Sequence, residues 1–294
     1  MKTIINLLKC PVCNSNISEN LKCEQCSYTI SKKKNVFLYK QFLDKQMLRE
    51  DNLNKEIIKN SKKFRKEIIN KKGIFSVKKI IKRIKKDKKI NKNSVVLELG
   101  GANGWLSEIV SKETSNVYNT DISFCFLKYG KIPSFLIPMN KIDKIFKKES
   151  FDIVWVNAAL HHCENLDEVF KAVKYVLKKK GIFIISNELI VGKIIKNPDV
   201  KKANEAGAQD YPYQLSHYVN TSKKYLKTSI FLPDDLDYFI KNPQVIQTGY
   251  KRIIFRLIKK VGFFRLKDTF LFKKIYLAFG ELFGAPVLII CEND

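Results

Sequence analysis

The chain has 294 residues, of which 55 are lysine or arginine and 29 are aspartate or glutamate, so its formal net charge is +26. Apolar residues make up 45% and aromatic residues 12%, which excludes a disordered basic tail and predicts about two folded domains. The longest apolar stretch, residues 275–290, is interrupted by Glu281 and the first eight residues are too short for a secretory signal, so we expect a soluble, cytoplasmic protein without a transmembrane segment.

The first forty residues contain two Cys-x-x-Cys pairs, formed by Cys10 with Cys13 and by Cys23 with Cys26. Four thiolates on two such turns can surround Zn²⁺ tetrahedrally and leave no open position for chemistry, whereas a single pair would leave a redox role open. We therefore predict a small structural zinc ribbon over residues 1–40, stabilised largely by its metal. Residues 4–40 resemble the zinc-ribbon family that activates transfer-RNA methyltransferases, although that family's Gly-Ile-Pro turn is missing.

Residues 41–93 form a basic connector that we expect to be helical. Within it, residues 51–93 hold 17 basic residues against 4 acidic ones, but only six arginines occur in the whole chain. Arginine is the side chain best suited to phosphate and guanine, so this lysine excess indicates nucleic-acid binding only weakly. A solvated face, a phosphate-binding surface and a membrane-surface contact stay open as interpretations.

The connector's apolar residues have helical spacing. One apolar face is predicted at Val77, Ile80, Ile81 and Ile84, continuing a similar pattern at Ile57, Ile58, Phe64, Ile68 and Ile69, with Gly73 between two helices.

From residue 94 to residue 294, strand-like and helix-like patterns alternate, which is typical of an α/β domain with a mostly parallel sheet of seven strands. The expected strands are Val95–Leu99, Asn116–Thr120, Ser134–Pro138, Phe151–Val156, Ile182–Ser186, Phe263–Phe272 and Val287–Cys291. Helices are expected after the first strand to about Lys112, at Leu166–Leu177 and at Ile253–Val261. Residues 191–250 have weak periodicity and are interpreted as an insertion that covers the site.

A glycine-rich turn, Gly100-Gly101-Ala102-Asn103-Gly104, follows the first of these strands. Glycine lets a backbone approach a ligand closely, and the helix that follows favours ligand groups that accept hydrogen bonds. Asp121, at the end of the next strand, is placed to bind both hydroxyls of a ribose. Nicotinamide enzymes use the same construction, although the glycines here lack their Gly-x-Gly-x-x-Gly spacing. Ala102 fits this turn only if its φ is negative.

Further segments follow this turn in a characteristic order: residues 150–157, the Leu-His-His of residues 160–162, and residues 176–188. Together they resemble the class I S-adenosylmethionine-dependent methyltransferase family over residues 94–190, which implies a Rossmann-like fold. The resemblance also implies that Glu98 and the Gly100–Gly104 backbone hold the methionine end of S-adenosylmethionine, and that Asp121 holds its ribose. It places Met139 and Asn140 beside the adenine, with Asn157 completing the set; the family usually has an acid where Asn140 stands.

Three residues are candidates for the methyl-acceptor side. His162 follows the fourth strand and Glu188 the fifth, while His217 lies in a run, residues 210–218, that resembles an element of methyltransferases encoded with cell-surface saccharide enzymes. Methyl transfer is an in-line displacement in which positioning does most of the work, and a base is needed only if the acceptor loses a proton. Loop packing is the alternative role for His162, and helix packing for the run around His217.

The expected function is therefore methyl transfer to a small metabolite or saccharide intermediate. Two alternatives stay open: a ribosomal RNA base methyltransferase, because the ribbon-plus-domain layout also resembles the large-subunit guanine methyltransferases, and a non-catalytic scaffold with a methyltransferase-like fold.

Overall fold

A computed structural model describes residues 2–60, 71–194, 210–233, 236–237, 260 and 263–294. A single sheet runs through the molecule in the strand order β1-β2-β5-β4-β3-β6-β7-β9-β8. The strands are β1 Ser31–Lys33, β2 Val36–Leu38, β3 Val95–Leu99, β4 Asn116–Asp121, β5 Ser134–Leu136, β6 Phe151–Asn157, β7 Leu177–Ser186, β8 Lys227–Phe231 and β9 Leu288–Glu292. The α-helices are α1 Lys2–Leu7, α2 Lys45–Asn60, α4 Lys71–Lys86, α5 Trp105–Val110, α6 Phe124–Leu127, α7 Leu166–Val176, α9 Leu215–Lys223 and α12 Phe270–Phe283.

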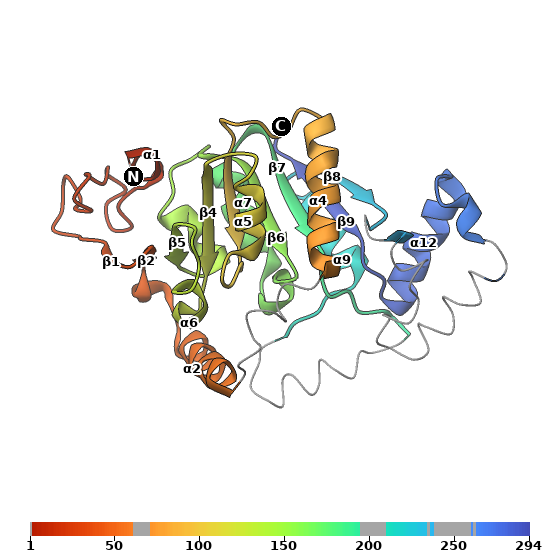
Figure 1. Cartoon of the computed structure of the whole chain (residues 1–294), viewed down its shortest axis with the longest axis horizontal. Coiled ribbons are helices and arrows are strands. Elements are labelled where there is room, and N and C mark those ends of the chain that lie inside the picture. The colour runs from red at the N-terminus through yellow and green to blue at the C-terminus, as the bar shows by residue number, and fades with distance from the viewer. Residues whose placement is uncertain (1, 61–70, 195–209, 234–235, 238–259, 261–262) are drawn as a thin grey trace.

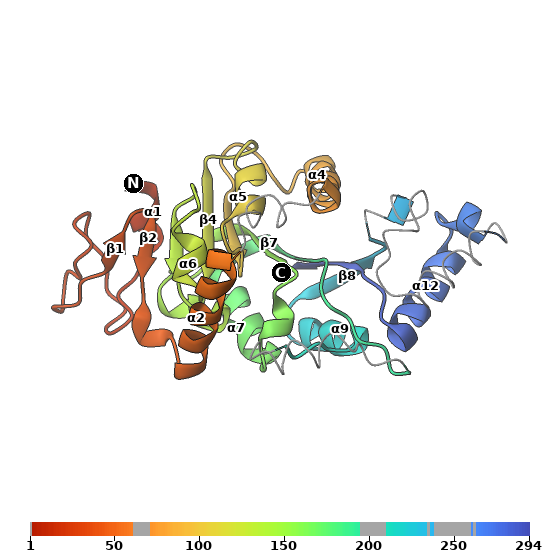
Figure 2. The same cartoon turned by 60° about the horizontal axis from the view of Figure 1, so that its bottom comes forward.

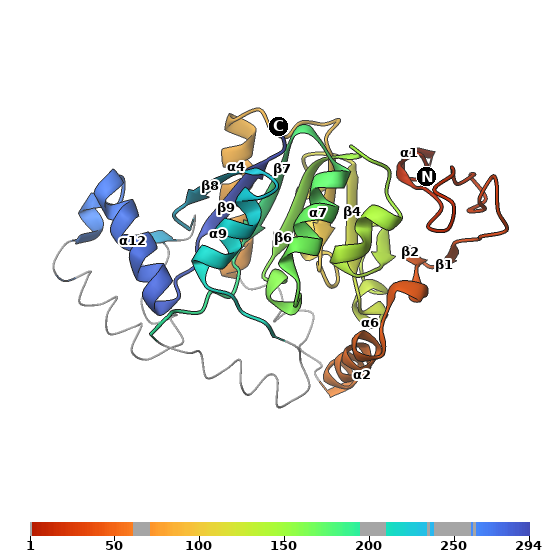
Figure 3. The same ribbon diagram turned by 180° about the vertical axis from the view of Figure 1, so that it is seen from behind.

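Helices cover both faces of this sheet. Figure 1 shows α4 and α5 in front of the strands, and Figure 3, seen from the opposite side, shows α7 and α9 on the other face. Figure 2 shows the same three layers along the sheet, with α12 at the end of the molecule opposite the N-terminal strands. The sequence prediction of an α/β fold with a mostly parallel sheet is confirmed, because strands β5, β4, β3, β6 and β7 run parallel and β9 pairs antiparallel with both β7 and β8.

The N-terminal region adds two strands that the sequence did not predict. Strand β2 pairs in parallel with β5, and β1 pairs antiparallel with β2, which extends the sheet from seven strands to nine. Phe37 of β2 stacks on Phe135 of β5 with ring centroids 4.8 Å apart. Leu8 is fully buried in the same apolar cluster, so the cysteine-containing segment shares a core with the rest of the protein.

The predicted strand Phe263–Phe272 is wrong. Residues Phe263–Leu266 form a 3₁₀ turn, and α12 begins at Phe270 because the side chain of Thr269 accepts a hydrogen bond from the N–H of Phe272. The sixth strand of the domain is instead β8, inside the expected insertion 191–250. Its residues are only partly buried at the edge of the sheet, so they lack the alternation that marks a strand in sequence. The predicted helix Ile253–Val261 lies outside the described residues.

The connector contributes helices α2 and α4. Val77, Ile80, Ile81 and Ile84 are each at most 5% exposed, which confirms the predicted apolar face of α4. Gly73 lies inside α4 and does not separate two helices, so that prediction is wrong. The side chains of Ile57, Ile58, Phe64, Ile68 and Ile69 are outside the described part. Within that part, we find no helix with the length and apolar content needed to cross a membrane.

Candidate functional site

The turn after β3 is held in a conformation that needs glycine. Gly100 and Gly104 have φ of +61° and +74°, in the left-handed region. A Cβ on Gly101 would lie 2.2 Å from Oδ1 of Asn119, so no side chain fits there. Ala102 also has a positive φ, +47°, and the expectation that this alanine requires a negative φ is therefore wrong.

Two side chains of β4 fasten this turn. Asp121 accepts a 2.8 Å hydrogen bond from the N–H of Ala102 through Oδ2, and another of 2.8 Å from the N–H of Ser123 through Oδ1. The amide of Asn119 donates to the carbonyl oxygen of Ala102 at 3.1 Å. The structure therefore brings Asp121 against the glycine-rich turn, as the sequence predicted, and Asn119 is a supporting residue that sequence reasoning missed.

Glu98 lies beneath the turn with 2% of its surface exposed. Its carboxylate accepts hydrogen bonds from the N–H of Ser107, at 2.9 Å, and from the Ser107 hydroxyl, so it anchors α5. Burial raises the pKa of Glu98 from an ordinary 4.5 to about 8, which outweighs the lowering by the Ser107 hydrogen bonds. The described hydrogen bonds of Glu98 are thus made with α5, and Glu98 supports the turn from its buried side.

The residues predicted beside the adenine have different surroundings. Met139 lies next to the turn, because its Cε would be 3.4 Å from a Cβ on Gly100. The amide nitrogen of Asn140 donates to Glu168 of α7 at 2.8 Å. Asn157, at the end of β6, accepts through Oδ1 from the Ser186 hydroxyl at 2.9 Å and from the Asn187 amide at 2.8 Å. Only Met139 of these three has a described contact with the glycine-rich turn.

The loop after β6 lies directly against the turn. A Cβ on Gly100 would approach the Cβ of Ala159 to 2.7 Å. Both oxygens of the buried Glu188 hold this loop: Oε1 accepts from the N–H groups of Ala159 and Leu160 at 2.8 and 2.9 Å, and Oε2 lies 3.0 Å from Nδ1 of His161. Glu188 therefore orders the loop, and its carboxylate is already occupied within the protein.

His162 forms a pair with a carboxylate that sequence reasoning did not assign. Its Nδ1 lies 3.0 Å from Oδ1 of Asp210, and the side chains are 36% and 12% exposed. The neighbouring His162 lowers the pKa of Asp210, against the opposing effect of burial, so this carboxyl stays ionised. His161, His162 and Asp210 also bring one ligating atom each within 4.8 Å of one another. An ionised carboxylate on Nδ1 orients the ring and favours the tautomer in which Nε2 carries the free lone pair.

His217, the third candidate on the acceptor side, has contacts of a different kind. It is exposed on α9 and stacks on Tyr213, with ring centroids 4.6 Å apart and an interplanar angle of 12°. The Tyr213 hydroxyl donates to the carbonyl oxygens of Cys163 and Glu164, at 2.8 and 2.6 Å. The described contacts therefore bring His162 to the glycine-rich turn through its loop, but they do not bring His217 there.

Helix α2 reaches the same edge of the sheet. Its buried residue Asp51 accepts from the Ser123 hydroxyl at 2.8 Å and from the N–H of Cys125 at 3.1 Å, and it pairs with Lys55. Burial opposes ionisation, yet the hydrogen bonds from Lys55, Cys125 and Ser123 lower the pKa of Asp51 overall. The connector is thereby fastened beside Asp121, a contact between distant segments that no local sequence signal marks.

The four N-terminal cysteines converge as predicted. Their sulfur atoms all lie within 4.8 Å of one another, and Sγ–Sγ distances of 3.5 Å for Cys10 and Cys26 and 3.4 Å for Cys13 and Cys23 are recorded. Tetrahedral Zn²⁺ with Zn–S bonds of about 2.3 Å requires sulfur atoms about 3.8 Å apart. The donor set and its spacing therefore fit a tetrahedral metal ion.

Comparison with known proteins agrees with this architecture. Residues 97–185 match the family model described as "Methyltransferase domain". A curated relative, the mitochondrial arginine-hydroxylase NDUFAF5 of Homo sapiens, is 29% identical over 94 residues, which is 31% of this chain and 27% of that protein. The chain thus matches about a quarter of the length of that curated relative.

Solved structures resemble the chain at low sequence identity. The YcgJ protein from Bacillus subtilis has 14% identity and a TM-score of 0.46, over 74% of this chain and 97% of its own. Phosphoethanolamine N-methyltransferase 2 of Haemonchus contortus has 16% identity and a TM-score of 0.48, over 70% and 49%. Geranyl diphosphate C-methyltransferase from Streptomyces coelicolor has 14% identity and a TM-score of 0.49, over 70% and 72%.

Proposed function

Because residues 97–185 form a class I, S-adenosylmethionine-dependent methyltransferase domain, we propose that this chain transfers a methyl group to a hydroxyl of a small metabolite or saccharide intermediate. The observation that carries the proposal is the pair formed by Asp210 with His162, whose loop packs against the glycine-rich turn through Ala159. S-adenosylmethionine supplies an already activated methyl group, so the protein has to position the acceptor and remove its proton.

The glycine-rich turn provides the cofactor site in this proposal. The Gly100–Gly104 backbone and Asp121 would hold the cofactor, with Met139 beside them. Asn103 adds support, because its buried Oδ1 has no hydrogen-bond partner in the part of the chain that the structure describes. A buried acceptor of this kind is suited to the ammonium group of the cofactor's methionine end. Glu98 acts indirectly, through its hydrogen bonds to Ser107.

We assign the role of general base, which removes the proton of the acceptor hydroxyl, to His162. Asp210 holds the Nδ1 side of the ring, so Nε2 is the atom that accepts the proton of the acceptor hydroxyl as that oxygen bonds the methyl carbon and the bond from this carbon to sulfur breaks. Glu188 has a positioning role, since it ties the backbone of Ala159 and Leu160 and thereby fixes the loop that carries His162. A hydroxyl acceptor has to lose its proton on methylation and gains from a base, whereas an acceptor without a proton to lose needs none, so this pair favours an oxygen acceptor.

Two alternatives have observations of their own. The exposed lysines of α4 (Lys78, Lys82, Lys85 and Lys86) favour an RNA acceptor. The positive φ of Ala102 and the bond from Asn140 to Glu168 favour a scaffold with weakened cofactor binding. We rank both below the small acceptor, because neither accounts for a carboxylate-oriented histidine at the turn.

The N-terminal cysteines are assigned to a structural zinc ion. Four sulfur ligands leave no open coordination position, so the metal would stabilise the fold and take no part in methyl transfer. The resemblance of residues 4–40 to the activator ribbons supports a second role in contacting a partner protein or RNA.

The test is a transfer assay with methyl-labelled S-adenosylmethionine, offered separately with small-molecule and RNA fractions from cells. We expect label in the small-molecule fraction, and none there for an Asp121→Ala variant, which loses a cofactor-binding carboxylate but keeps the four cysteines. Label in RNA alone would replace the proposal by the RNA alternative. Cofactor binding without transfer to either fraction would favour the scaffold.

A further inference from the structure

Helix α12 is apolar on two opposite faces. Phe272 is 1% exposed and packs toward the body of the protein, whereas Phe270, Leu271 and Ile275 are 72%, 60% and 42% exposed. Leu282 continues the outer face at 38%. Large apolar side chains gathered on the exposed face of a helix indicate contact with another apolar phase. Figure 2 shows that α12 lies at one end of the molecule, opposite the N-terminal strands.

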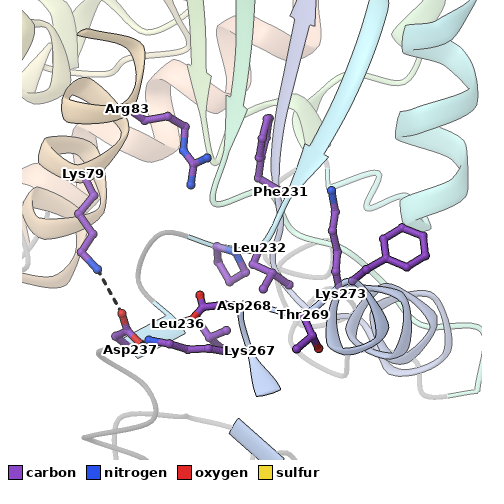
Figure 4. A pocket seen from close by; sticks show the side chains of 12 residues that line it. Lys79, Arg83, Phe231, Leu232, Leu236, Asp237, Lys267, Asp268, Thr269 and Lys273 are labelled. Atoms are coloured by element: carbon purple, nitrogen blue, oxygen red, sulfur yellow. Dashed lines mark hydrogen bonds and ion pairs between the residues drawn. The ribbon is translucent and has the colours of Figure 1, made fainter. Parts of the chain in front are cut away.

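A cavity of about 560 Å³ lies next to the start of this helix. It is lined by four cationic side chains, two carboxylates and an apolar wall, namely Lys79, Arg83, Lys267, Lys273, Asp237, Asp268, Phe231, Leu232, Pro233, Leu236, Thr269 and Phe270. Figure 4 shows Lys79 and Arg83 entering from α4 and Lys273 from α12, with Lys267 coming from the turn before α12. The lining therefore has a net positive charge, which favours an anionic group.

The cationic side chains of the cavity contact two residues, Asp237 and Phe231. Asp237 is an ion-pair partner of both Lys267 and Lys79, the latter at 3.7 Å, and these contacts lower the pKa of Asp237. Arg83 and Lys273 instead lie over the ring of Phe231, at 4.7 and 5.5 Å from its centroid. Figure 4 shows these two cations on either side of the ring, where both add positive charge to the lining of the cavity, which favours a phosphate.

The cavity and the apolar face are continuous. Phe270 lines the cavity and also begins the exposed face of α12, and Lys274 lies 4.7 Å from its ring. An apolar face that borders a cationic site matches the boundary between lipid chains and anionic headgroups. RNA would use the cations but has no use for exposed Leu271 and Ile275.

We propose that α12 docks the protein on an anionic phospholipid bilayer, with Phe270, Leu271 and Ile275 entering the interfacial region and the adjoining cavity receiving a lipid phosphate. The protein would lie on the membrane without crossing it. This inference is independent of the identity of the methyl acceptor.

The experiment is flotation of the full-length protein with vesicles of phosphatidylcholine, either pure or containing about one third phosphatidylglycerol. Each cation near an anionic surface contributes about fivefold to binding. We therefore expect the Arg83→Gln/Lys273→Gln variant to bind the mixed vesicles roughly 25-fold less tightly than the unmodified protein. We expect Phe270→Ser/Leu271→Ser to lose at least about tenfold, since two exposed apolar side chains no longer enter the interface.

Matched controls separate docking from general charge and folding. Lys144→Gln/Lys148→Gln removes the same charge from exposed positions outside the cavity, and Tyr129→Ser removes another exposed ring; both should bind vesicles like the unmodified protein. If the double variant unfolds, the single variant Leu271→Ser, at a highly exposed position, tests whether the exposed face of α12 binds vesicles.

Equal binding to neutral and mixed vesicles would overturn the proposal, as would equal losses in the Lys144/Lys148 control. Saturable binding of inorganic phosphate without vesicle binding would show that the cavity takes a free anion instead. Loss of RNA binding in the Arg83/Lys273 variant, without vesicle binding by the unmodified protein, would assign the face to RNA.

Discussion

The backbone N–H of Ala102 donates a 2.8 Å hydrogen bond to Oδ2 of Asp121, which ties the turn after β3 to the end of β4. This bond places the carboxylate assigned to the ribose against the backbone assigned to the methionine end of the cofactor. It forms with Ala102 in a left-handed conformation, where a side chain is strained.

Replacing Ala102 by glycine should relieve that strain. We expect Ala102→Gly to raise the free energy of unfolding by about 1 kcal/mol, as measured by urea denaturation, without weakening cofactor binding. A loss of stability would mean that the methyl group makes packing contacts worth more than the backbone strain.

Replacing Gly101 by alanine should have the opposite effect. The new Cβ would lie 2.2 Å from Asn119 Oδ1 and 2.4 Å from Glu98 Cδ, both of them in side chains that are held by other bonds. We expect roughly 1–3 kcal/mol of destabilisation and a large loss of S-adenosylmethionine affinity in calorimetric titration. Affinity equal to that of the unmodified protein would remove the turn from the cofactor site.

Glu98 should make stability depend on pH. Its pKa of about 8 lies above the ordinary 4.5, so the folded protein holds an additional proton between these values. The stabilisation of the folded state by the protonated Glu98 carboxyl is complete below about pH 4.5 and is lost as the pH rises through about 8. Asn119 Oδ1 is a buried acceptor without a partner among the described residues, and it lies on the same side of Gly101 as the Glu98 carboxyl, which fits a protonated Glu98 as its donor.

The variant Glu98→Gln tests this assignment, because an amide still accepts from Ser107 and donates to Asn119 but does not titrate. We compare the two proteins without cofactor at about pH 5.5 and 8.5. The free energy of unfolding should fall over this range in the unmodified protein, and the fall should be smaller in Glu98→Gln by more than about 1 kcal/mol. Parallel pH profiles for the two proteins would contradict the raised pKa.

Removal of the proposed zinc should affect the whole sheet. The cysteine-containing segment continues into β2, which pairs with β5, and Phe37 stacks on Phe135 across that pair. We expect about one zinc per chain by elemental analysis, and a fall in melting temperature of more than about 5 °C on chelation or in Cys13→Ser. Ser15→Ala, beside the cluster, should keep the metal. A metal-free protein with an unchanged melting curve would show that the cysteines do not bind zinc.

Local patterns predicted much of this molecule, and the failures have physical causes. The buried strands β3 to β7 and the glycine-rich turn carry strong local signals, so they were found in the right order. Strand β8 was missed because an edge strand with half-exposed residues has no alternation, and Phe263–Phe272 was misread because an apolar run fits a helix equally well.

The candidate site shows the same division. The candidate role of Asp121 could be predicted from its place at the end of β4. The partners of His162 and Asn140 could not, because they depend on contacts between distant segments. Asp210 meets His162, and Glu168 takes the amide of Asn140, only when the chain is folded. Glu188 is well placed in sequence for catalysis, yet folding commits its oxygens to the loop it supports.

The proposed role of the His162–Asp210 pair is most directly tested by the rate of methyl transfer in Asp210→Asn and His162→Asn variants, beside calorimetric affinity for S-adenosylmethionine. General base catalysis typically contributes about 100-fold to 10,000-fold. We expect His162→Asn to lower kcat by at least about 100-fold, Asp210→Asn to lower it in the same direction, and cofactor affinity to stay within about twofold. His217→Asn, the matched control, should transfer methyl groups at the unmodified rate. Unchanged kcat in both His162→Asn and Asp210→Asn, or loss of activity in His217→Asn alone, would contradict this account.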